Sequence, residues 1–268
     1  MEGIDVFDIV HYIESCMACH ASASLIMQGR AGQPLRRDRR RGRIMSALAG
    51  HAGIGGWFAP AAYVAILATA ISCGSLILLH VLSPEFSPSW RMVSEYANGR
   101  FHWLLTLVFI GWAVSSFALV VALWPLSASL LGKIGLIFLF LAGVGQIMGA
   151  LFDINHRLHG PAAMVGIPSL CIAAVLLTIA LARRTGIEPP PMWSAHLPWI
   201  SFVLMLGAFA LFFSALKAAG VDMSGQNGPL KELPEGVSGY VGWANRLLFI
   251  ASYLWAVFAS MSVLRADV

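Results

Sequence analysis

Charged residues are scarce in this 268-residue chain, and their scarcity limits the classes of protein to which it can belong. Asp, Glu, Lys and Arg make up 11% of the residues, whereas 58% are hydrophobic. Soluble globular domains carry about 25% charged residues. A soluble helical fold also needs polar residues along one side of each helix, yet the segment LIFLFLAGVGQIMGALF is apolar on nearly every side. The composition therefore excludes an ordinary soluble domain and indicates a membrane protein.

Cysteine is also rare, with four residues in the chain. Two of them fall inside long apolar runs, where a free thiol packs as a small apolar side chain. Cys16 and Cys19, followed by His20, match the C-x-x-C-H pattern of covalent haem attachment. That chemistry requires export of the motif, whereas the arginines between Arg30 and Arg43 favour retention in the cytoplasm. We therefore interpret the N-terminal cysteines as an incidental pair.

Long apolar runs, in contrast, dominate the rest of the sequence. Each of six runs has about 20 residues or more, enough to cross ~30 Å of hydrocarbon at 1.5 Å per residue. We predict an all-α fold, a polytopic transmembrane bundle of six helices within residues 56–265, preceded by a basic and weakly structured tail over residues 1–55. The predicted spans are Trp57–Leu82, Phe101–Leu126, Leu130–Phe152, Pro161–Ala182, Leu197–Leu216 and Val241–Leu264.

The basic segment PLRRDRRRGR supplies most of the net charge of +4. Basic runs occur in nucleic-acid-binding proteins, but beside an apolar span such a run favours a cytoplasmic anchor attracted to anionic lipid. We therefore expect no nucleic-acid partner. With the tail inside, the cytoplasmic side carries eleven Lys and Arg and the opposite side five. This bias predicts a multi-pass protein of the bacterial cytoplasmic (inner) membrane with both termini in the cytoplasm; translation from Met45 would remove residues 1–44 and the bias with them.

Polar residues gather at one face of the predicted bundle. Six crossings place the first, third and fifth connections together on that face. Because a charge inside a membrane is costly to desolvate, we expect Arg246 to pair with Glu95 or Asp153. This pairing either sets the register of the helices or forms part of a pocket. The candidate ligand-binding residues are Ser94, Glu95, Tyr96, Asp153, His159 and Arg246.

A second hypothesis places a metal ion at the same face. Asp153, His156 and His159 follow one another at short spacing, and imidazole and carboxylate groups are ligands of zinc. Three protein ligands and one water would make a hydrolytic site. The spacing matches no known zinc signature, so we expect no cofactor and keep zinc as the alternative. A single haem held by His80 or His102 together with His159 is a further alternative.

A G-x-x-x-G step, Gly145 and Gly149, lies in the third span beside Gln146. Small residues at this spacing let a second helix approach closely, and an amide can form a hydrogen bond across such a contact. We predict a contact within one chain rather than dimerisation.

Three segments carry a resemblance to a known family. They are SEYANGR before the second span, LFDINHRLHGPAA at the end of the third and GWANRLLF at the start of the last. In these segments the sequence resembles the uncharacterised family named domain of unknown function 998, over approximately Ala59–Val263. The resemblance implies a bacterial or archaeal integral membrane protein of about six helices, and it implies no particular activity.

The leading functional prediction is a multi-pass membrane protein with a polar pocket at one membrane face. This pocket would bind a lipid headgroup or a small polar ligand, and membrane lipids are the expected partners. A competing hypothesis is a metal-dependent intramembrane hydrolase in which Glu95 acts as the base. A third is a structural or assembly protein without a ligand. All three stay open on the sequence alone.

Overall fold

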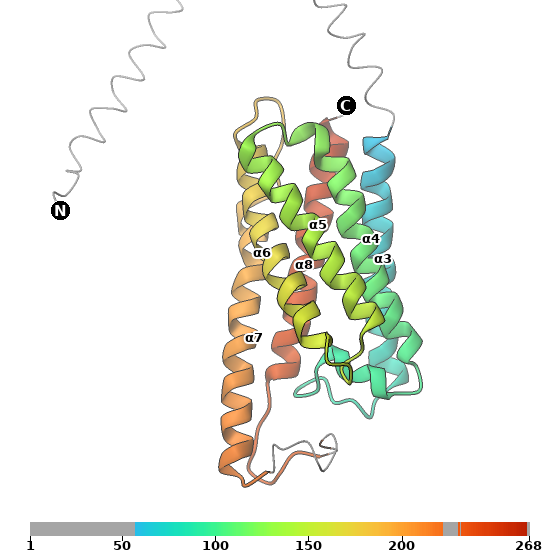
Figure 1. The fold of residues 1–268 in the computed structure, drawn as a ribbon, viewed down its shortest axis with the longest axis vertical. Coiled ribbons are helices and arrows are strands. Elements are labelled where there is room, and N and C mark those ends of the chain that lie inside the picture. Colours follow the sequence, from blue (N-terminus) through green and yellow to red (C-terminus); the bar gives the residue numbers. More distant parts are fainter. Residues whose placement is uncertain (1–56, 222–229, 231, 267–268) are drawn as a thin grey trace, which may run out of the picture. The chain divides into compact units, whose positions relative to one another are not determined.

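The structure, a computed structural model, describes residues 57–221, 230 and 232–266. They belong to one compact unit, residues 54–268. Within the described residues the chain forms six long apolar helices and two short 3₁₀ helices, without a strand. The elements are α3 (Phe58–Leu82), η1 (Val93–Asn98), α4 (His102–Leu123), η2 (Trp124–Leu126), α5 (Leu130–Leu151), α6 (His159–Ala182), α7 (Met192–Ala218) and α8 (Val241–Ala266), as Figure 1 shows.

The helices of this unit are long and apolar enough to cross a membrane, which confirms the predicted fold class. Large apolar side chains also cover their outer surfaces, with Leu67, Ile77, Ile137 and Leu211 among the most exposed. Such a surface is stable in hydrocarbon and not in water. The protein is therefore a multi-pass membrane protein. The predicted tail, the Cys16–Cys19 pair and a start at Met45 lie outside the described residues.

Two helices begin earlier in the chain than the apolar pattern predicts. Helix α6 begins at His159 rather than at Pro161. Pro161 then lies in the first turn, where its missing N–H has no intrahelical acceptor to lose. Helix α7 begins at Met192, directly after Pro191, although its apolar run begins at Leu197. The first turn of α7 contains polar residues, so the apolar pattern does not include it.

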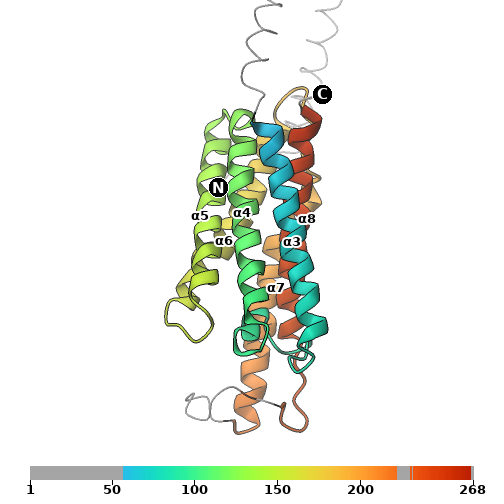
Figure 2. The same ribbon diagram turned by 90° about the vertical axis from the view of Figure 1, so that its right-hand side faces the viewer.

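Each helix of the bundle packs against its neighbours in sequence, and α8 also packs against α3. Figures 1 and 2 show α8 beside both α3 and α7. Helix α8 is the most buried of the described spans and α7 the least. Most polar side chains of α8, including Asn245 and Arg246, are buried, so their hydrogen-bonding groups need protein partners.

The predicted close contact in the third span is confirmed. A Cβ atom on Gly145 in α5 would overlap the backbone of Gly166 in α6, so the two helices meet backbone to backbone there. Gln146, the next residue, accepts a hydrogen bond from Ser116 of α4 at 2.8 Å. The small residue and the amide thus join α5 to two neighbouring helices within one chain.

The first and third connections lie at the same end of the bundle, as predicted, together with the start of α8. This is the lower end in Figure 1. The side chain of Asn155 in the third connection donates to Asn98 of η1 at 2.9 Å. The backbone N–H of Gly242, at the start of α8, donates to the carbonyl oxygen of Ser89 in the first connection at 2.9 Å. These bonds gather the predicted polar segments at one end.

Candidate ligand site

Arg246 lies in a buried hydrogen-bond cluster where α3, α8 and the first connection meet. The residue is 4% exposed. Its Nε donates to His80 Nε2 at 2.5 Å, and its Nη2 donates to the hydroxyl of Tyr96 at 3.3 Å. Its Nη1 donates to the carbonyl oxygens of Arg91 at 2.6 Å and Gly242 at 3.0 Å. We call Arg246, His80 and Tyr96 the arginine cluster. It fixes the first connection to two helices.

His80 accepts a hydrogen bond from Arg246 at Nε2, because its other ring nitrogen, Nδ1, acts as a donor. Nδ1 lies 2.6 Å from the carbonyl oxygen of Leu76, one turn earlier in α3. A carbonyl oxygen only accepts, so Nδ1 carries the proton and Nε2 is left as an acceptor. Both ring nitrogens are therefore occupied within the protein. The haem alternative loses His80 as an axial ligand.

The prediction that Arg246 pairs with Glu95 or Asp153 is wrong. Glu95 Oε2 forms its ion pair with Arg91 Nη1, at 2.5 Å, and Glu95 Oε1 accepts from the backbone N–H of Met92 at 2.8 Å. Asp153 is exposed. Among the described residues, the partners of Arg246 are carbonyl oxygens, a hydroxyl and an imidazole. Matching opposite charges in the sequence cannot identify these partners, because none of these groups carries a negative charge.

The three predicted metal ligands do not converge on one point. Asp153 Oδ1 accepts from the backbone N–H of Asn155 at 2.9 Å, and the exposed ring of His156 stacks on Phe152. His159 donates from Nδ1 to the carbonyl oxygen of Phe152 at 2.8 Å. In the part of the chain that the structure describes, no group of three His, Cys, Asp or Glu side chains is placed to hold a metal ion. The geometry therefore gives the zinc hypothesis no support.

A cavity of about 330 Å³ lies between the α5–α6 pair and the α7–α8 pair. Its walls consist mainly of aromatic, methionine and aliphatic side chains, with glycines where α5 and α6 meet. It is thus more apolar than the polar pocket predicted from the sequence. The principal apolar lining residues are Phe109, Trp112, Ile154, Met164, Ile167, Phe202, Met205, Phe209 and Phe249.

Few polar side chains reach this cavity. Ser94 of η1, His159 at the start of α6 and Asn245 near the start of α8 line it. We call these three residues the rim. Asn245 also holds the first connection in place, because its Oδ1 accepts from the backbone N–H of Val93 at 2.9 Å. The rim therefore lies at the end of the bundle that carries the first and third connections.

Gln146 is the polar side chain that lines the cavity from within α5. It is 4% exposed. Its Oε1 accepts from Ser116 Oγ at 2.8 Å, whereas its Nε2 is buried and has no hydrogen-bond partner among the described residues. An unpaired buried donor costs roughly 1–3 kcal/mol. Because lipid tails offer no acceptor, this amide calls for an explanation.

The six predicted ligand-binding residues separate into distinct environments. Ser94 and His159 line the cavity, whereas Tyr96 and Arg246 are buried in the arginine cluster. Glu95 is held by Arg91, and Asp153 is exposed and is not among the residues that line the cavity.

Sequence analysis did not assign Gln146 or Asn245 to a ligand site. Each had a visible signal, because each is an amide inside a predicted apolar span. The phenylalanine and methionine residues of the cavity wall had none, since the same residue types also face lipid.

Comparison with known proteins agrees with the family resemblance of the three segments SEYANGR, LFDINHRLHGPAA and GWANRLLF. The family model described as "Protein of unknown function (DUF998)" matches residues 64–262. This range includes the arginine cluster, the rim and Gln146. No curated protein and no solved structure matches the chain. Because the matched range covers well over half of its 268 residues, the chain belongs to the DUF998 family, whose function is unknown.

Proposed function

We propose that this protein binds a single membrane lipid in the cavity, with the polar end of the lipid at the rim formed by Ser94, His159 and Asn245. The observation that carries the proposal is the cavity itself, about 330 Å³ of space with apolar walls and few polar groups. Ligand pockets in proteins have about 300–1,000 Å³ and this same balance of lining groups. A small polar ligand would leave most of the wall without a partner. An amphipathic molecule would satisfy both the wall and the rim.

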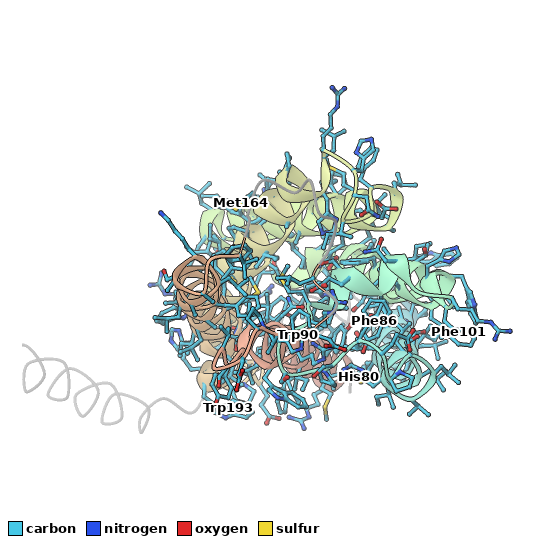
Figure 3. The ribbon with its side chains drawn as sticks, turned by 90° about the horizontal axis from the view of Figure 1, so that it is seen from below. His80, Phe86, Trp90, Phe101, Met164 and Trp193 are labelled. Carbon is cyan, nitrogen blue, oxygen red and sulfur yellow. The ribbon has the colours of Figure 1, made fainter. Side chains whose placement is uncertain are left out.

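The position of the cavity in the bundle supports entry from the bilayer. Met164 of α6, 65% exposed, and the exposed Leu206 and Phe209 of α7 line the cavity and also reach the outer surface of the bundle. Figure 3, viewed along the bundle, places Met164 on the opposite side from His80. A lipid tail could therefore pass between α6 and α7 without crossing the arginine cluster.

The membrane and its orientation form part of the same proposal. We propose the bacterial cytoplasmic membrane, with both termini in the cytoplasm and the rim at the outer face. The support is the excess of Lys and Arg on the side of the termini, the bias that orients multi-pass proteins. Membrane lipid is accordingly the proposed partner.

The hydrolase hypothesis has weaker support. Glu95, its proposed base, is held by an ion pair with Arg91 and by a backbone N–H. The proposed metal ligands are engaged separately. A structural role without a ligand is the main competing outcome of the experiment below.

The test is to fill the cavity and measure retained lipid. Ala163 lines the cavity, so Ala163→Trp would occupy part of it. The matched control is Ala70→Trp, which places the same side chain on the exposed surface of α3. Each protein is extracted in a mild detergent, and bound lipid is counted by native mass spectrometry. We expect one tightly retained lipid in the unmodified protein and in Ala70→Trp. We expect at least about a tenfold loss of occupancy in Ala163→Trp, equivalent to roughly 1.4 kcal/mol of binding free energy.

Equal lipid retention by all three proteins would contradict the proposal, because lipid at the outer surface does not depend on the cavity. Absence of retained lipid from the unmodified protein, with no uptake when lipid is added back, would favour the structural role instead.

A further inference from the structure

Gln146 has a donor that its structural role does not use. The contact with α4 uses its Oε1, which accepts from the buried hydroxyl of Ser116 at 2.8 Å. This bond orients the side-chain amide and leaves Nε2 directed elsewhere. Nε2 is buried, and no group among the described residues accepts from it. Packing of α5 against its neighbours therefore accounts for the Oε1 atom of the amide, whereas it does not account for the Nε2 atom.

The environment of this donor narrows what can bind it. Gln146 lines a cavity whose walls are mainly apolar, with Phe109 and Trp112 of α4 and Phe249 of α8 among the other lining residues. A ligand atom that satisfies Nε2 must be an acceptor, and it must be attached to a molecule whose remainder tolerates aromatic and aliphatic walls. A saturated hydrocarbon tail has no such atom. An acyl carbonyl oxygen has both properties.

The depth of Gln146 also fits an acyl carbonyl. Gln146 lies five residues before Leu151, the last residue of α5, which places it about 7–8 Å inside the end of the helix at 1.5 Å per residue. The rim lies at that same end of the bundle, with His159 as the first residue of α6. A lipid whose polar end is at the rim would place its acyl linkage deeper in the bundle than the rim, on the side of Gln146.

We propose that Gln146 recognises the carbonyl oxygen of an acyl chain, donating to it from Nε2. The ligand of the cavity is then an acyl lipid, with its headgroup at Ser94, His159 and Asn245 and its chain among the aromatic and methionine side chains of α7 and α8. This inference rests on the proposed function. It adds a chemical class of ligand and one residue that selects it. Ser116 is a positioning residue, because it orients the amide without touching the ligand.

The test compares two probes that differ in the carbonyl alone. Delipidated protein is mixed with a diacyl phospholipid or with the diether phospholipid of the same headgroup and chain length, and bound lipid is measured by native mass spectrometry. A single hydrogen bond changes an equilibrium by roughly three- to tenfold. We therefore expect the unmodified protein to prefer the diacyl lipid by that factor. In Gln146→Leu the preference should fall to about one, mainly through weaker binding of the diacyl lipid.

Two further variants keep the result interpretable. Gln146→Met replaces the amide with a flexible side chain, should Gln146→Leu fail to fold, and is expected to lose the preference equally. Ser116→Ala keeps the donor but frees its orientation, so an intermediate preference is expected.

A free fatty acid of the same chain length separates the two sources of a carbonyl. We expect it to bind less tightly than the diacyl lipid, whereas tighter and Gln146-dependent binding would assign the carbonyl to a free acid.

Failure of this inference can be distinguished from failure of the proposed function. If the unmodified protein binds diacyl and diether lipids equally, or if Gln146→Leu keeps the preference, Gln146 does not recognise a carbonyl. The cavity would still be a lipid site provided that Ala163→Trp weakens both probes. If Ala163→Trp weakens neither, the proposed function fails together with the inference.

Discussion

The two polar regions at the lower end of the bundle differ in how far the protein satisfies its own hydrogen-bonding groups. The arginine cluster holds a charged side chain, and the protein supplies acceptors to all three guanidinium nitrogens. The cavity holds only uncharged amide, hydroxyl and imidazole groups, yet one of its donors has no partner among the described residues. The charged side chain of Arg246 thus lies in the region where the protein itself supplies all the hydrogen-bond partners of that side chain. The unpaired amide of Gln146 lies in the region where we propose that a ligand binds.

Helix α8 contributes adjacent residues to both regions. Arg246 belongs to the cluster and Asn245 to the rim. Successive residues of an α-helix point about 100° apart, so one turn of α8 serves a structural purpose on one side and lines a cavity on the other. A rigid connection of this kind suits a binding site, because side chains at the rim are held by the same helix that the cluster fixes.

The largest effect should come from removing the charge of the cluster. Arg246→Met keeps most of the apolar length of the side chain but removes the donors to His80, Tyr96 and two carbonyl oxygens. Buried acceptors left without a donor cost roughly 1–3 kcal/mol each, although hydrogen bonds in membrane bundles average about 0.6 kcal/mol. We expect a loss of about 2–4 kcal/mol in the free energy of unfolding, measured by titration with sodium dodecyl sulfate in mixed micelles.

Arg265→Met is the matched control for this substitution. Arg265 also lies on α8, and it pairs with Glu188 at 2.7 Å, but both side chains are at least half exposed. Exposed ion pairs contribute roughly 0–1 kcal/mol. If both substitutions cost the same, burial of the cluster is not what makes Arg246 structural, and the contrast between the two regions is lost.

The next effect concerns the wall of the cavity. Gly145→Ala places a methyl group against the backbone of Gly166 and forces α5 and α6 apart. Overpacking of this kind costs roughly 1–3 kcal/mol. Gly74→Ala in α3 is the control, because a Cβ there meets no atom within 4 Å. It should stabilise the helix by up to about 1 kcal/mol. The same unfolding titration should therefore give opposite signs, and a loss of stability in both proteins would mean that the close contact is unimportant.

The sequence predicted the features that depend on averages over many residues. Six spans, the shared end of the first and third connections and the contact at Gly145 follow from hydrophobic length, from the parity of crossings and from small-residue spacing. None of these predictions depends on the exact position of an individual polar side chain. The family resemblance, which rested on three short segments, was also confirmed.

The candidate site was predicted less well, because its contacts depend on where individual atoms lie. Arg246 was expected to pair with a carboxylate, but it donates to the carbonyl oxygen of Arg91 in the first connection, while Glu95 pairs with the side chain of Arg91. A local pair four residues apart needs no tertiary structure to form. Backbone acceptors are present at every position, so sequence cannot tell which ones lack a partner. Gln146 was noticed for helix packing, but an unused hydrogen-bond donor becomes visible only when its surroundings are known.

The smallest effect is expected when one hydrogen bond of the arginine cluster is removed and the others are kept. Tyr96→Phe removes the hydroxyl that accepts from Arg246 Nη2 at 3.3 Å, the longest bond of the cluster, and leaves the ring packed against Phe86 with centroids 5.0 Å apart. We expect a loss of about 0.5–1.5 kcal/mol in the free energy of unfolding, smaller than that for Arg246→Met. Tyr63→Phe on the exposed face of α3, the control, should leave stability unchanged. Because Tyr96 lies outside the cavity, lipid occupancy should stay that of the unmodified protein. If Tyr96→Phe lowered occupancy as strongly as Ala163→Trp, the cluster and the cavity would form one site, and the distinction between a completed region and an open one would have to be abandoned.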